Sequence, residues 1–191
     1  MATAPPPAVL DAVRRLVESA ARPVVLIDGG AGSGKTTLAG RLVRHWPGPG
    51  AVQTVSLDDL YPGWSGLAAG SAAVPALVKG NGYRRWDWQA SQPDGWQALD
   101  PSAALVVEGC GALTPASREV AGLCIWVELE PARRRRRALA RDGAVFAAHW
   151  EEWARQEAEH WRKNRPWELA DVVVGGAAPG FPPATPMPHN G

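Results

Sequence analysis

A glycine-rich segment near the N-terminus has the residue types and spacing of a phosphate-binding loop. Residues 29–36 read GGAGSGKT and match the pattern GxxxxGK[S/T]. Glycines let several backbone N–H groups turn toward one point, and the positive end of a following helix strengthens the attraction for anions. The ammonium group of Lys35 can reach the outer phosphates, and the hydroxyl of Thr36 can ligate magnesium. The expected phosphate contacts are Gly30, Ala31, Gly32, Ser33, Gly34, Lys35, Thr36 and Thr37.

Two acidic residues follow apolar runs further along the chain. Asp58 comes after the run at 51–57, and Glu108 ends the run at 105–107. The carboxyl ends of parallel strands face the ligand crevice of an open α/β sheet, so both acids are expected near the loop. Asp58 is favoured as the base for an attacking hydroxyl, with a magnesium-bound water or an Asx turn as alternatives. Glu108 is favoured as a magnesium ligand, with a turn cap as its alternative. Asp28, directly before the loop, is expected to hydrogen-bond the loop backbone.

Five consecutive arginines, at 133–137, occur within a predicted helix. Consecutive helical residues point in all directions, so only a subset can contact one ligand. Arg133, Arg137 and Arg141 share one face, which favours a lid that clamps the transferring phosphoryl group. We expect Arg137 and Arg141 to contact the nucleotide and Arg141 to act in catalysis. A solvated helix face and RNA binding are the alternatives, and a formal net charge of +1 argues against nucleic acid.

The segment YRRWDW at 83–88 combines stacking surfaces, cations and an acid. An aromatic plate with an acid for vicinal hydroxyls would suit a nucleoside, although ordinary packing explains the tryptophans equally well. Basic Arg84 and Arg85 would favour an acceptor that already carries phosphate. The expected acceptor contacts are Asp59, Tyr61, Arg84, Arg85, Trp86 and Asp87. Trp150, Trp153 and Trp161 have the spacing of a helix face and are expected in the core.

The elements that must position these residues alternate between strand and helix. Apolar runs predict strands at 24–27, 51–57, 105–107, 123–129 and 172–174. Helical spacing and capping signals predict helices at 8–21, 38–45, part of 66–79, 114–120, 131–142 and 144–163. This alternation predicts an α/β fold, with a mostly parallel five-stranded sheet between two helical layers and an arginine-rich lid helix. We expect one domain over 1–174 and a poorly ordered Pro- and Gly-rich tail at 175–191.

Together these segments resemble the uridine kinase family of P-loop kinases, to which nicotinamide riboside and pantothenate kinases are related. The resembling stretches are GGAGSGKTT at 29–37, DDLY at 58–61, VVEG at 106–109 and the arginine-rich helix that ends in Arg141-Asp142. Trp86-Asp87-Trp88 is similar to the segment with which the family holds the hydroxyls of its acceptor. The family's later ERGRD-like stretch is replaced here by GAVF at 143–146.

The resemblance implies a P-loop NTPase fold and a phosphotransferase that uses ATP and Mg²⁺. Its reaction would transfer the γ-phosphoryl group to a hydroxyl of a small molecule, most naturally a nucleoside or a nucleoside-like compound. The matching positions imply that Asp58 is the base, that Glu108 lies beside magnesium and that Arg141 touches the ATP phosphates. The sequence specifies ATP handling better than it specifies the acceptor.

Other functions remain open because a phosphate loop alone does not define a reaction. The acceptor could be a nucleoside monophosphate, a sugar acid or an antibiotic, and a nucleotide-binding regulatory module is an alternative of another class. The sequence has no NKxD motif of GTPases and no LSGGQ-like signature of transporters.

Charge and hydropathy indicate a cytoplasmic protein without nucleic-acid or membrane partners. Its apolar runs are shorter than the ~20 residues of a membrane helix, and the N-terminus does not resemble a signal peptide. Cys110 and Cys124 lie in apolar runs without metal-ligand spacing, which indicates free thiols in a reducing compartment. Oligomeric state is left open by the sequence.

Overall fold

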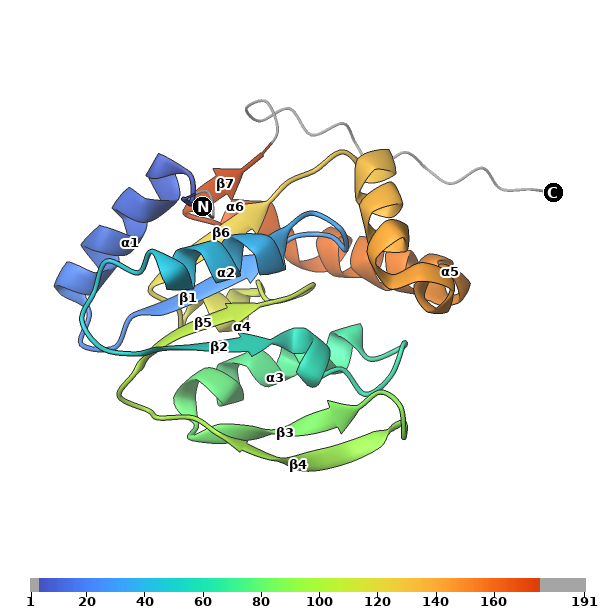
Figure 1. The fold of residues 1–191 in the computed structure, drawn as a ribbon, viewed down its shortest axis with the longest axis horizontal. Helices are drawn as coiled ribbons and strands as arrows, with labels where there is room; N and C mark the ends of the chain where they lie inside the picture. Colours follow the sequence, from blue (N-terminus) through green and yellow to red (C-terminus); the bar gives the residue numbers. More distant parts are fainter. Residues whose placement is uncertain (1–3, 176–191) are drawn as a thin grey trace.

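A five-stranded parallel sheet organises residues 4–175, the part of the chain that the computed structural model describes (Figure 1). The strands lie in the order β2-β5-β1-β6-β7, and every neighbouring pair is parallel. Their bounds are β1 Val24–Asp28, β2 Val52–Ser56, β5 Ala104–Glu108, β6 Leu123–Val127 and β7 Val172–Val174. The central strands β1, β5 and β6 are buried along their whole length, as expected for apolar runs covered on both faces. The predicted sheet is confirmed.

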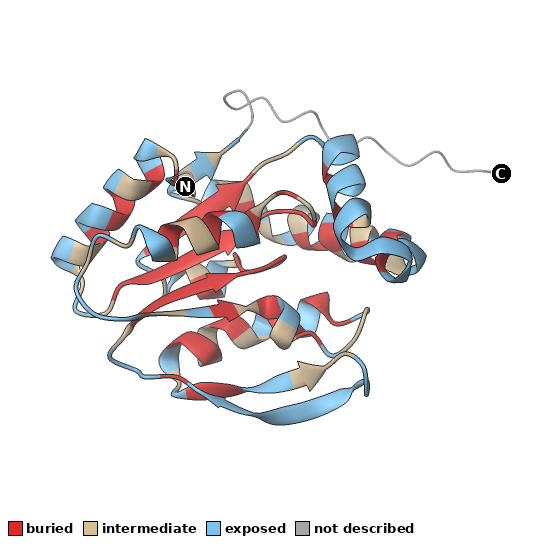
Figure 2. Cartoon of the chain, in the orientation of Figure 1, coloured by how far each residue is buried: buried red, intermediate tan, exposed pale blue. Residues whose placement is uncertain are grey.

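Helices cover both faces of this sheet, and Figure 2 shows the buried strands between them. Successive residues of β1 point to opposite faces: Val25 and Ile27 pack with α1 and α2, whereas Leu26 packs on the side of α3 and α5. The helices are α1 Pro7–Ser19, α2 Lys35–Arg44, α3 Leu67–Lys79, α4 Pro115–Arg118, α5 Pro131–Asn164 and α6 Pro166–Leu169. Among residues 4–175, none of the helices combines the length and apolar character of a membrane span.

Helix α5 bends sharply at Gly143, where φ is 63° and ψ is −147°. This backbone conformation is open to glycine and strained for other residues. The bend divides α5 into a first arm, 131–142, and a second arm, 144–164, which run in different directions in Figure 1. The two helices predicted on either side of Gly143 correspond to these arms.

An antiparallel ribbon formed by β3 (Gly82–Asp87) and β4 (Gln92–Ala98) was not among the predicted elements. All seven residues of β4 are exposed, so the segment lacks the apolar alternation by which a half-buried strand is recognised. The Asp87 carboxylate accepts hydrogen bonds from the backbone N–H groups of Gln89 and Ala90, at 2.8 and 3.0 Å, and so shapes the turn. Of the predicted tail at 175–191, all residues except Gly175 lie outside the described part of the chain.

Candidate active site

A cavity of about 730 Å³ opens where β1, β2 and β5 end. Its walls come from the loop before α2, the short 3-10 turn η1 (Leu57–Asp59), the segment after β5 and both arms of α5. Lys35, Asp58 and Glu108 all line it, and so do Thr36 and Arg141. The residues predicted to handle ATP therefore meet in one place, although they are up to 106 positions apart in the sequence, from Lys35 to Arg141.

The glycine-rich loop forms one wall of this cavity and packs tightly against α5. A Cβ atom on Gly32, where φ is 78°, would lie 2.2 Å from the backbone oxygen of Arg134. Gly34 adopts a left-handed conformation with φ 108° and directly precedes α2, whose N-terminus thus faces the cavity. The loop residues that line the cavity are Ala31, Gly32, Gly34, Lys35, Thr36 and Thr37. Gly30 and Ser33, which were also expected to contact phosphate, are not part of its wall.

Lys35 is buried beneath the loop, and its Nζ donates to the backbone oxygen of Gly30 at 3.1 Å and to Cys110 Sγ at 3.3 Å. Burial alone lowers the pKa of Lys35, but its interactions with the Cys110 side chain and with the carboxylates of Glu108, Glu157 and Asp28 give it a net raised pKa. Burial also raises the pKa of the Cys110 thiol above its usual range, so Cys110 is neutral near pH 7. The neighbouring carboxylates therefore keep the lysine charged, as phosphate binding requires.

Two hydroxyl groups converge on Glu108, which is buried at the end of β5. Thr36 Oγ1 donates to Glu108 Oε1 at 3.2 Å, and Ser56 Oγ donates to the same oxygen at 2.9 Å. Over residues 4–175 there is no group of three or more His, Cys, Asp or Glu side chains that could hold a metal by themselves. Magnesium, however, is usually bound by one or two protein oxygens together with phosphates and water. Thr36 and Glu108 fit a Mg²⁺ ion that arrives with a nucleotide.

Asp58 lies in η1, directly after β2, with its side chain open to the cavity. Asp58 keeps an exposed surface toward the cavity, but partial desolvation by the surrounding protein raises its pKa; the negative charge of Glu108 raises it further, against opposing effects of Lys35 and Arg141. The Trp88 indole N–H donates to the Asp58 carbonyl at 2.7 Å and holds this turn in place. A carboxylate so placed can accept the proton of a hydroxyl group in the cavity.

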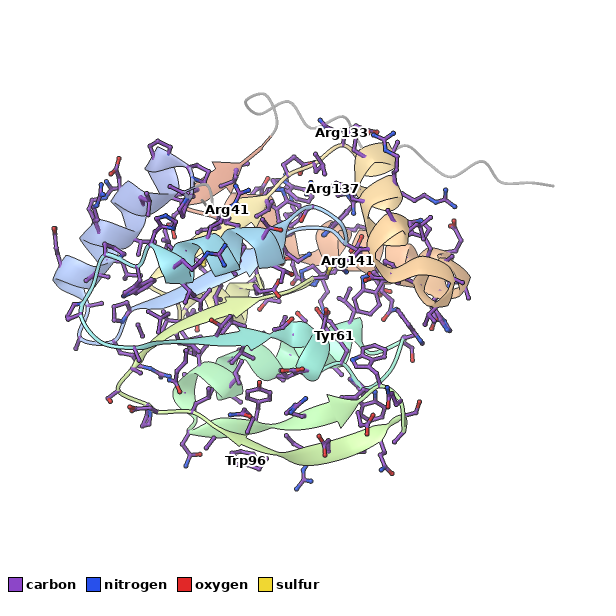
Figure 3. All side chains as sticks on the ribbon, viewed as in Figure 1. Arg41, Tyr61, Trp96, Arg133, Arg137 and Arg141 are labelled. Atoms are coloured by element: carbon purple, nitrogen blue, oxygen red, sulfur yellow. The ribbon has the colours of Figure 1, made fainter. Side chains whose placement is uncertain are left out.

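Arginines from the first arm of α5 close the cavity on the side of the loop. Figure 3 shows Arg133, Arg137 and Arg141 spaced along this arm, and the latter two line the cavity. Arg141 forms two hydrogen bonds with the Asp142 carboxylate, at 2.7 and 2.6 Å, which orient its guanidinium. Arg133 is not part of the cavity wall, in contrast to the predicted three-residue stripe. The role of this arm as a lid stays a prediction.

The predicted acceptor contacts differ from the structure. Tyr61 lines the cavity, but its hydroxyl is buried and donates to the Cys110 carbonyl at 2.7 Å. Five other residues lie outside the cavity wall: Asp59, Arg84, Arg85, Trp86 and Asp87. The ribbon places them elsewhere, since Asp59 accepts from the Tyr83 hydroxyl at 3.1 Å and Arg84 donates to the Asp94 carbonyl at 3.3 Å. Only the last residue of the segment, Trp88, reaches the cavity.

An aromatic wall forms the other side of the cavity; Tyr61 and the segment that ends in Trp88 were predicted to lie near the acceptor, whereas Trp64 and Phe146 were not. Its members come from three separate segments: Tyr61, Trp64, Trp88, Phe146 and Trp153. Trp64 lies at the centre, with its ring 5.0 Å from that of Trp88 and stacked 5.6 Å from that of Phe146. Trp153 was expected in the core and is buried, yet it also borders the cavity. The rings are tilted to one another, by 59° between Trp64 and Trp88 and by 89° between Trp64 and Trp153, so together they form an apolar but uneven surface.

Asp28 anchors the base of the loop, as the sequence predicted. Its carboxylate is fully buried and accepts hydrogen bonds from the N–H groups of Gly29 at 2.6 Å, Gly111 at 3.0 Å and Leu113 at 2.9 Å. The loop after β1 and the segment after β5 are thus held by one carboxylate, which fixes the relative positions of two cavity walls.

Replacement of Asp28 by Asn is expected to lower the free energy of unfolding by about 2–3 kcal/mol. The amide would retain one acceptor oxygen but would turn its NH₂ group toward a backbone donor, which would lose its partner in a buried place. Urea denaturation measures the loss. Asp11→Asn is the control, because Asp11 is exposed on α1, and should stay within about 0.5 kcal/mol of the parent. Equal stability of the two variants would contradict the anchoring role.

Solved structures share this fold. A possible uridine kinase from Bacillus stearothermophilus aligns with a TM-score of 0.58 and 18% identity, over 88% of this chain and 100% of that one. A protein from Silicibacter sp. TM1040, provisionally described as a fructose transport system kinase, aligns with a TM-score of 0.55 and 18% identity, over 88% of this chain and 98% of that one. No protein-family model and no curated protein matches the sequence. At this level of identity, the likeness establishes the fold.

Proposed function

We propose that this chain is an ATP-dependent kinase that transfers the γ-phosphoryl group to a hydroxyl of a small, nucleoside-like molecule. The observation that carries the proposal is the shared cavity, which is lined by Lys35 and Thr36 of the loop, by Asp58 and by an aromatic wall. The two solved structures that share the fold are themselves described as kinases, which supports the proposal.

Each group in the cavity has a defined part in the proposed reaction. Lys35 and the N–H groups of the loop bind the β and γ phosphates, except for the N–H of Ala31, which was expected to contact phosphate but donates to Glu157. Thr36 and Glu108 would hold Mg²⁺, which when bound neutralises phosphate charge. Asp58 orients the acceptor hydroxyl and takes its proton as the new O–P bond forms and the bond to the ADP oxygen breaks in line. Arg137 and Arg141 stabilise the charge on the transferring group.

The walls of the cavity favour a neutral, ring-bearing acceptor. The aromatic wall gives the cavity that holds Asp58 an apolar lining, whereas Arg84 and Arg85, which would have suited a phosphorylated acceptor, lie outside the cavity. A nucleoside thus fits better than a nucleoside monophosphate or a sugar acid. We also propose a single domain over 1–174. A cytoplasmic location is proposed as well, since Cys110 and Cys124 are free thiols, which are typical of a reducing compartment.

Acceptor screening tests the function directly. We expect the rate of ADP formation from Mg-ATP to rise about tenfold or more with a pool of nucleosides, because the hydroxyl replaces water as the attacking group. A pool of nucleoside monophosphates is the matched control and should give a smaller rise. A rate that responds to neither pool, nor to pools of sugars and antibiotics, would favour the regulatory module over the kinase.

A further inference from the structure

A buried ion pair joins the two arms of α5 away from the bend at Gly143. Arg134 of the first arm and Glu157 of the second arm lie 3.2 Å apart, measured from Nη1 to Oε2, with side chains 9% and 2% exposed. The guanidinium of Arg134 also lies over the ring of Trp161, at 5.1 Å from its centroid. Arg134 is thus the arginine of the 133–137 run that turns inward, although it does not line the cavity.

This ion pair holds one residue of the phosphate loop by both of its backbone polar groups. The N–H of Ala31 donates to Glu157 Oε1 at 2.6 Å, and Arg134 Nη1 donates to the carbonyl oxygen of Ala31 at 3.3 Å. Glu157 Oε1 also accepts from the Cys110 thiol at 3.2 Å. The Arg134 guanidinium also packs closely against the neighbouring loop residue, because a Cβ atom on Gly30 would lie 1.9 Å from Arg134 Nη1.

Stability alone does not account for such an arrangement. A buried ion pair often contributes little net stability compared with apolar residues of similar volume, since both charges must be desolvated. The pair does, however, fix the geometry of a glycine-rich segment that would otherwise sample many backbone conformations. A loop that already has its binding shape loses less conformational entropy when phosphate binds, and therefore binds more tightly.

We propose that Arg134 and Glu157 are positioning residues that hold the phosphate loop in its nucleotide-binding shape and tie it to both arms of α5. The inference rests on the proposed ATP site. It assigns no contact with nucleotide to either side chain, and it predicts that their loss weakens nucleotide binding in a protein that still folds.

The affinity for Mg²⁺ and a nonhydrolysable ATP analogue, measured by isothermal titration calorimetry, tests this role. Glu157→Gln keeps the shape of the side chain but loses its charge, and Arg134→Met loses every donor; each should raise the Kd about tenfold or more. Arg134→Lys keeps a charged donor and should recover most of the affinity. Glu159→Gln, on an exposed position of the same arm, is the matched control and should stay within about twofold of the parent.

A double variant shows whether the two residues act as one unit. If they do, Arg134→Met with Glu157→Gln should bind the analogue about as weakly as the worse single variant, because either change already releases the loop. If the losses of analogue affinity in the two single variants multiply in the double variant, the two residues act separately, and the proposal that they hold the loop together is wrong.

Hydrogen exchange of the nucleotide-free protein provides a readout that does not depend on ATP. The amide of Ala31 should exchange about tenfold faster or more in Glu157→Gln, while amides in β1 and β5 keep their protection. If the parent protein fails to bind the analogue, the proposed ATP site is wrong. If instead the Ala31 amide exchanges at the same rate in Glu157→Gln as in the parent, the role of Arg134 and Glu157 in holding the loop is wrong. Faster exchange with unchanged analogue affinity would also overturn the positioning role, because it would leave only a structural one.

Discussion

Lys35→Met is expected to reduce the rate of phosphoryl transfer on the order of a thousandfold or more, because it removes the only lysine in the cavity wall over the described residues 4–175. The Lys35 ammonium lies under the loop with its charge maintained by neighbouring carboxylates, and this charge is what would bind the β and γ phosphates. Methionine has a similar length and no charge, and it should preserve the packing. ADP formation with the best acceptor of the screen measures the effect.

Far-ultraviolet circular dichroism and thermal unfolding of Lys35→Met should match the parent, so that loss of activity is not loss of fold. Lys79→Met provides the matched control, since Lys79 is exposed at the end of α3, and its rate should be unchanged. Undiminished ATP consumption in Lys35→Met would contradict the assignment of the phosphate site.

Asp58→Asn is expected to slow transfer by about 10²–10⁴-fold while the affinity for the ATP analogue stays nearly unchanged. The amide keeps the shape of the side chain but cannot accept the proton of the acceptor hydroxyl. Single-turnover rates and calorimetric titrations separate the two quantities. If the substitution instead weakens binding of Mg²⁺ and the analogue at an undiminished maximal rate, Asp58 is a metal ligand rather than the base. Asp94→Asn, on the exposed strand β4, is the control and should leave both quantities unchanged.

The pH dependence gives the same assignment a second test. Partial desolvation and the charge of Glu108 raise the pKa of Asp58 from its ordinary value of 3.8. A protonated Asp58 cannot act as a base, so kcat/KM should fall as the pH falls through the raised pKa, and this acidic limb should lie above pH 3.8. Asp58→Asn should lose the limb and retain a low rate that is flat over that range.

The features that could be predicted from the sequence are those that depend on a pattern of consecutive residues. The strands β1, β5 and β6 are runs of apolar residues buried on both faces, and the loop at 29–36 is a continuous pattern. The two predicted helical stretches meet at Gly143, and the backbone of α5 bends at that residue. The convergence of Lys35, Asp58 and Glu108 followed from the predicted parallel direction of the strands, because the carboxyl ends of parallel strands lie at one edge of the sheet.

The features that escaped prediction depend on tertiary placement. The aromatic wall combines Trp64, Trp88 and Phe146, which belong to three segments with no shared sequence pattern. Arg134 could not be distinguished from its four neighbouring arginines, because its partner Glu157 is 23 positions away and meets it only after the chain has bent. The segment at 83–88 misled the interpretation, since its composition suits a pocket but its strand is held against η1 and β4.

The bend at Gly143 also restricts the lengths of the segments that it joins. Arg141 on one side and Phe146 on the other reach the same cavity, and Arg134 meets Glu157 at the far end. A single residue inserted into either arm would rotate everything beyond it by about 100° and would put these side chains out of phase. Although Gly143 itself lies at the surface, where extra residues are ordinarily tolerated, the spacing across it is as tightly constrained as the spacing of a buried strand.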